Sequence, residues 1–113
     1  MRGAATELSR CFVAKLAGWI GNEGTLALID RDPSPAKLRE ARQKVMTFAL
    51  ASARWTEFAA QHGDLAAERM RLWLDATEAR ATQRGATARA QAAAQARTWL
   101  AECVAAHTTR TSA

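Results

Sequence analysis

An apolar stripe between Leu38 and Ala59 constrains the fold of this chain more than any other feature of its sequence. Its members recur at spacings of three and four residues, so they lie along one side of an α-helix, as in a coiled-coil seam. Such a helix must cover that side with a partner, from the same chain or from another molecule. The stripe consists of Leu38, Ala41, Val45, Phe48, Ser52, Trp55 and Ala59.

The composition favours a helical protein with a thin core. A chain of 113 residues forms one domain (1–113) of ordinary size. Hydrophobic residues reach 49%, but Leu, Ile, Val and Phe together number only 18. Much of the remainder is alanine, which is the best helix former. We therefore expect an all-α fold whose small core gains from association with another surface.

Helix boundary signals divide the chain into an N-terminal helix and a longer helical part. Thr6 is a candidate N-cap, and the glycines from Gly18 onward predict the end of the first helix. Residues 25–29 predict a short helix, and the prolines of residues 30–35 predict a break. Ser34 followed by Pro35 then opens the striped helix, which is predicted to end near Gln61. Residues 1–5 and 107–113 are expected to fray.

The joint around Gly63 predicts an antiparallel helical hairpin. Gly63 suits a helix C-terminus and Asp64 suits the next N-cap. From Leu65 a second stripe passes through Gly85 to Ala106, mostly at spacings of four, three and four. The unbroken stripe favours one continuous helix, with an overhang covered by the N-terminal helix or by a second copy in a homodimer. The alternative is a break at Gly85 and a closed monomeric bundle.

The predicted fold is thus all-α: an antiparallel hairpin, 35–61 against 65–106, with an additional N-terminal helix, forming a small helical bundle that dimerisation would complete. The predicted structural core comes from both stripes and from the N-terminal helix. It comprises Phe12, Leu16, Leu38, Val45, Phe48, Trp55, Leu74 and Trp99.

Neither the cysteines nor the apolar segments indicate an exported or membrane-spanning protein. Cys11 and Cys103 do not form a disulfide framework, and we expect both to be reduced and buried. Charged residues interrupt any signal-peptide core near the N-terminus, and no uncharged run reaches the ~20 residues that cross a bilayer. The sequence therefore predicts a soluble, cytoplasmic protein.

Chemistry-bearing residues do not form a recognisable catalytic or cofactor site. Cys103 and His107 share a helix face, but a zinc site also needs Cys11 or His62 from other helices. The glycines at 18, 21 and 24 lack the spacing and the preceding strand of a phosphate-binding loop. We predict no enzyme activity, no metal and no cofactor.

The basic balance of the chain raises the possibility of nucleic-acid binding. Net charge is +5, and arginine, which outnumbers lysine, suits bidentate contact with phosphate. A helix reading nucleic acid would gather its arginines, whereas a continuous helix places the first two of these on one side and the other two on other sides. The candidates are Arg80, Arg84, Arg89 and Arg97.

Trp73, flanked by Arg69 and Arg71, is the candidate anchor for a protein partner, because it lies beside the second stripe rather than on it. The predicted function is a non-catalytic protein–protein interaction module: a small adaptor, assembly factor or regulator that docks helices. The alternative is a basic accessory protein on nucleic acid, and the third possibility is an amphipathic coat on a membrane or lipid granule. The sequence names neither the partner nor the biological process.

Overall fold

The chain folds into helices throughout its described part. The computed structural model describes residues 2–21 and 34–112, with side chains for 7–21 and 34–107. The predicted short helix at 25–29 and the break at 30–33 lie outside the described residues. The elements are α1 (Arg2–Trp19), α3 (Pro35–His62), the 3-10 turn η2 (Gly63–Leu65), α4 (Ala66–Gln83) and α5 (Thr87–Ser112). The predicted all-α class is confirmed.

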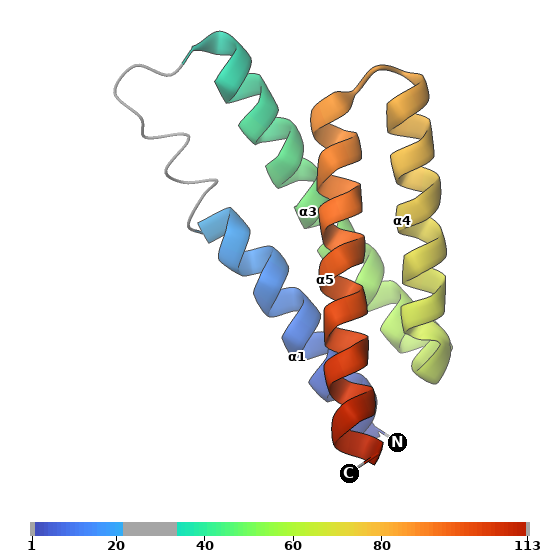
Figure 1. The fold of residues 1–113 in the computed structure, drawn as a ribbon. Helices are drawn as coiled ribbons and strands as arrows, with labels where there is room; N and C mark the ends of the chain where they lie inside the picture. Colours follow the sequence, from blue (N-terminus) through green and yellow to red (C-terminus); the bar gives the residue numbers. More distant parts are fainter. Residues whose placement is uncertain (1, 22–33, 113) are drawn as a thin grey trace.

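The helices form a small bundle in which consecutive elements reverse direction. In Figure 1, α3 descends to η2, α4 returns beside it and α5 descends again, while α1 lies antiparallel to α5. The start of α1 and the end of α5 therefore lie at the same end of the bundle. α1 contacts both α3 and α5, and so covers the core from one side. The predicted helical bundle with an N-terminal helix is confirmed.

The start of α3 follows the boundary signals in its sequence. The Ser34 side chain accepts a hydrogen bond from the Lys37 amide at 3.2 Å, and Pro35 occupies the first helical position. Glu40 and Lys44 pair at 3.3 Å on its exposed side. The helix ends at Gly63, whose φ of 54° lies in the region that favours glycine. α1 differs from expectation by beginning at Arg2, ahead of Thr6.

The prediction of a continuous helix across Gly85 is wrong. Gly85 has a φ of 70°, and the chain reverses there between α4 and α5. The Ala86 amide donates to the Ala81 carbonyl at 2.8 Å, and the Gly85 amide donates to the Thr82 carbonyl at 3.1 Å. These two bonds make a Schellman motif with glycine at its left-handed position.

The break at Gly85 also removes the argument for a homodimer. The overhang that would have needed a second copy is part of α5, which folds back along α4. Leu100 and Cys103 are buried within the single chain, where α1 and α3 cover α5. The closed bundle, weighed as the alternative, is the observed arrangement.

Replacing Gly85 with alanine is expected to destabilise the protein by about 1–2 kcal/mol, because a left-handed conformation strains an L-residue. The space around Gly85 would admit a methyl group, so the backbone alone sets the sign. Gly18→Ala is the matched control: Gly18 lies within α1, with nothing within 4 Å of an added Cβ. That change should stabilise the protein by about 0.4–1 kcal/mol. Equal effects of the two changes in urea denaturation would contradict the turn at Gly85.

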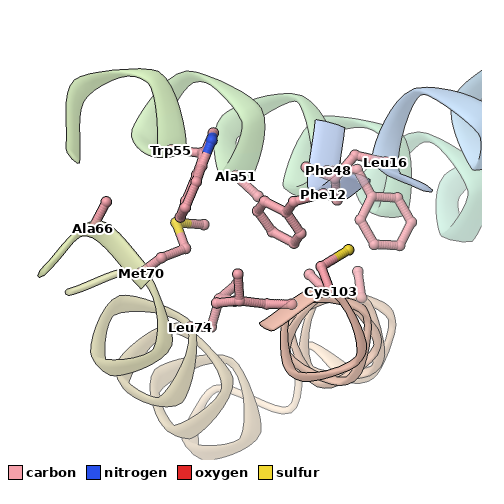
Figure 2. Close-up of a cluster of buried hydrophobic side chains, with 12 residues drawn as sticks. Phe12, Leu16, Phe48, Ala51, Trp55, Ala66, Met70, Leu74 and Cys103 are labelled. Carbon is pink, nitrogen blue, oxygen red and sulfur yellow. The ribbon is translucent and has the colours of Figure 1, made fainter. Parts of the chain in front are cut away.

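The core lies where all four helices converge. Figure 2 shows aromatic and aliphatic side chains from α1, α3, α4 and α5 meeting around one centre. Phe12 stacks edge-on to Trp55, with ring centroids 5.5 Å apart. Among the predicted core residues, Leu38, Val45 and Trp99 are half-buried. The others are fully buried: Phe12, Leu16, Phe48, Trp55 and Leu74.

The expectation of two reduced cysteines is wrong. Cys11 of α1 and Cys103 of α5 form a disulfide, with their Cα atoms 5.8 Å apart and a sequence separation of 92. α1 and α5 lie antiparallel, which brings two positions near opposite ends of the chain together. The disulfide therefore fastens the N-terminal helix to the last one.

Among the helices of residues 2–21 and 34–112, none combines the length and apolar character needed to cross a bilayer.

Candidate functional site

A groove lies between α3 and α4, at the end of the bundle where α4 turns into α5. Its volume is about 710 Å³. Its lining comes from the middle of α3, from the last turns of α4, and from the turn at Gly85 and the first turn of α5. The lining residues are Met46, Thr47, Ala49, Leu50, Thr77, Arg80, Ala81, Arg84, Ala86 and Arg89.

The α3 wall of the groove is apolar and open to solvent. Met46 is 64% exposed and Leu50 is 49% exposed, whereas the similarly exposed Leu65 and Leu72 do not line the groove. They lie four residues apart and so occupy the same side of α3, away from the buried Phe48 and Trp55. Sequence reasoning missed both residues, although two apolar positions off the main stripe at helical spacing were the available signal.

Three arginines stand around this apolar wall. Arg80 and Arg84 are one turn apart near the end of α4, and Arg89 is in the first turn of α5. All three are exposed. None of them forms an ion pair with another described residue; Arg80 makes only a long, 3.5 Å contact with the Thr77 hydroxyl.

The turn at Gly85 is what gathers these arginines. A continuous helix would have placed Arg89 on a different side from Arg80 and Arg84. The Schellman turn reverses the chain, so Arg89 lines the same groove as the other two. The expectation that the arginines do not cluster is therefore wrong for these three.

The fourth candidate, Arg97, is occupied within the bundle. Its guanidinium donates to Asp75 Oδ1 at 2.9 Å and also to Glu78, both on α4. The hydrogen bond to Asp75 and, to a smaller extent, that to Glu78 raise the pKa of Arg97. Arg97 thus joins α5 to α4 and does not belong to the groove.

The residues around Trp73 do not form an open site. Trp73 is half-buried and packs against the core. Arg71 is held by Glu68 at 2.6 Å and by Asp75 at 3.0 Å, and its hydrogen bond lowers the pKa of Glu68. Of Trp73, Arg71 and Arg69, the last is exposed and forms no ion pair with another described residue. A partner-binding role for this trio stays a prediction.

The disulfide and the histidines leave little material for a metal site. Both thiols are consumed by the Cys11–Cys103 bond. His107 Nδ1 lies 3.5 Å from Glu7 Oε2, and the His62 ring lies beside Phe58. Within the part of the chain that the structure describes, no three histidine, cysteine or acidic side chains are grouped for a metal ion.

No protein-family model, curated protein or solved structure matches this chain.

Proposed function

We propose that this protein is a non-catalytic helical interaction module, a small adaptor, assembly factor or regulator, that docks a helix of another protein in the α3–α4 groove. The observation that carries the proposal is the pair of exposed hydrophobic side chains, Met46 and Leu50, in a groove between two helices. Apolar side chains gathered at the surface and rimmed by polar ones are typical of protein interaction sites.

The shape of the groove supports a helix as its occupant. Two helices supply most of its lining, and Met46 and Leu50 are exposed to solvent within it. An occupant therefore covers the groove with one side and keeps its other side in water. An amphipathic helix does this with apolar residues at i, i+3, i+4 and i+7.

Site-specific photocrosslinking in the native cell tests the proposal. A photoreactive amino acid at position 46 or 50 should capture one defined protein. Leu72 is the matched control position, because it is 48% exposed on α4 and does not line the groove. Capture that is equal at 50 and 72, or absent at both 46 and 50, would refute docking in the groove.

Leu50→Asp should reduce that capture at position 46 by at least about ten-fold, since it places a charge in an apolar contact. The change should leave the free energy of unfolding within about 0.5 kcal/mol of wild type, because Leu50 is half-exposed. Circular dichroism in urea measures the second quantity. A large loss of stability together with retained capture would contradict the assignment.

Nucleic-acid binding is the second candidate, favoured by the clustering of Arg80, Arg84 and Arg89. If these three neutralise three phosphates of a duplex, affinity should fall about 40-fold between 50 and 200 mM salt. Leu50→Asp should then change the affinity for the duplex only through its added negative charge. A coat on a membrane or lipid granule remains third, because the main apolar sides of the helices are used in the bundle.

The disulfide counts against the predicted cytoplasmic location, since such bonds persist mainly in oxidising compartments.

Homodimerisation through the groove would place two sets of arginines opposite one another, which is unfavourable. We therefore assign the groove to a different protein, and a homodimer through another face stays a prediction.

A further inference from the structure

We infer that the helix recognised by the groove is acidic as well as amphipathic: its apolar side covers Met46 and Leu50, and its carboxylates pair with Arg80, Arg84 and Arg89. This inference rests on the proposed function and names the chemistry of the partner. It follows from the charge, spacing and surroundings of the three arginines.

The charge of the groove is uncompensated within the described chain. The residues that line it include three arginines and no acid. Elsewhere among the described residues, Arg54, Arg71 and Arg97 each contact a carboxylate of the same chain, while other exposed arginines form no ion pair. The groove arginines differ from those others because three of them stand together beside an apolar surface that a partner would cover. A covering partner that lacked acids would bury these charges at a cost.

The spacing of the arginines matches carboxylates on a helix. Arg80 and Arg84 are four residues apart, which places them about 6 Å apart along the axis of α4. Acidic residues at i and i+4 of a docked helix have the same separation. Arginine binds carboxylates in a bidentate manner, so each pair also fixes the register of the partner. Arg89, on the other side of the turn at Gly85, provides a third contact. This contact fixes the direction in which the docked partner helix runs along the groove.

The apolar wall distinguishes this partner from other anions. A phosphate backbone would use the arginines and leave Met46 and Leu50 exposed to water. A second copy of this chain, docked groove to groove, would supply arginines where carboxylates are needed. Of these three occupants, the acidic amphipathic segment is the one that satisfies the apolar wall and the arginines together.

A displayed library of amphipathic helices tests the inference without a known partner. The peptides are roughly 18 residues long, enough to form isolated helices. Their stripe of Leu and Ala is fixed, and the flanking positions are randomised among Asp, Glu, Lys, Arg, Gln and Ser. Selection on the full chain should enrich Asp and Glu at i, i+4 positions over the unselected library.

The selected peptides are then measured against two charge-matched triple variants at 50 mM salt. Replacing Arg80, Arg84 and Arg89 with Gln should weaken binding about ten-fold or more. Replacing Arg10, Lys15 and Lys37 with Gln removes the same charge at positions outside the groove and should change binding less than about two-fold. Equal losses in the two variants would show attraction to net charge alone and would overturn the inference.

Leu50→Asp separates failure of this inference from failure of the proposed function. Binders that depend on Leu50 but show no acidic excess would overturn the acidic partner and leave helix docking intact. If no selected helix depends on Leu50, both fail. A single-stranded DNA of roughly 20 nucleotides serves as the comparison anion. Tighter binding of this DNA, dependent on the three arginines but not on Leu50, would assign the groove to nucleic acid instead.

Discussion

Trp55→Ala is expected to lower the free energy of unfolding by about 3–5 kcal/mol, the usual loss when a buried tryptophan is truncated. Trp55 is 1% exposed and lies at the centre of the core, where it meets the ring of Phe12 and, in Figure 2, the side chain of Met70. Its indole N–H donates to the Ser9 hydroxyl at 2.8 Å. The residue thus joins α3 to α1 through both packing and a hydrogen bond. A loss of this size is a large part of the stability of an ordinary domain.

Urea denaturation followed by circular dichroism measures the effect, with two control variants. Ser9→Ala removes only the hydrogen-bond partner of the indole and should cost about 1–3 kcal/mol, since the N–H is left unsatisfied. Leu72→Ala truncates a large hydrophobic side chain that is 48% exposed and should stay within about 1 kcal/mol of wild type. If Trp55→Ala costs no more than Leu72→Ala, the centre of the core is not at Trp55.

The local signals in the sequence predicted α3 well, because its boundaries depend on nearby residues. The Ser34–Pro35 pair sets the start, and Gly63 sets the end. The three-and-four spacing identified the buried side of the helix, including Phe48 and Trp55. Each of these features acts within a few residues, so no knowledge of the other helices was needed.

The sequence did not reveal the break at Gly85, because the apolar stripe keeps the same helical spacing before and after this residue. Ala81 and Ala88 are both buried, as in a continuous helix, yet they belong to helices that run in opposite directions. In so alanine-rich a segment, small apolar residues occupy nearly every register, so periodicity carries little information. The backbone at Gly85 decided the outcome, and glycine is compatible with both conformations.

The candidate groove could not be predicted either, because it depends on how the helices are placed relative to one another. Met46 and Leu50 are visible in the sequence as an apolar pair off the main stripe. That they stand uncovered depends on where α4 lies, and that Arg89 joins Arg80 depends on the turn between α4 and α5. Tertiary placement, not residue type, creates this site.

The disulfide is likewise a consequence of tertiary placement, since only the antiparallel contact of α1 with α5 brings Cys11 to Cys103. Its loss should have the other large effect on stability. Closing a loop of 92 residues restricts the unfolded chain by about 4–5 kcal/mol in the loop-entropy model. We therefore expect reduction by dithiothreitol to lower the melting temperature of the wild type by more than about 10 °C.

The variant with both Cys11→Ala and Cys103→Ala is the control for the reductant. It should melt close to the reduced wild type and should not respond to dithiothreitol, because it has no bond to break. Denaturation of the oxidised and reduced wild type should differ by about 4–5 kcal/mol. A difference below about 1 kcal/mol, or two thiols titrated in the untreated native protein, would refute the bond.

A confirmed difference in stability also bears on the α3–α4 groove. α1 covers the side chains of α3 that face the core, on the side of α3 opposite Met46 and Leu50. If the disulfide is needed to keep α1 in place, α3 and the groove beside it would be ordered chiefly in an oxidising compartment.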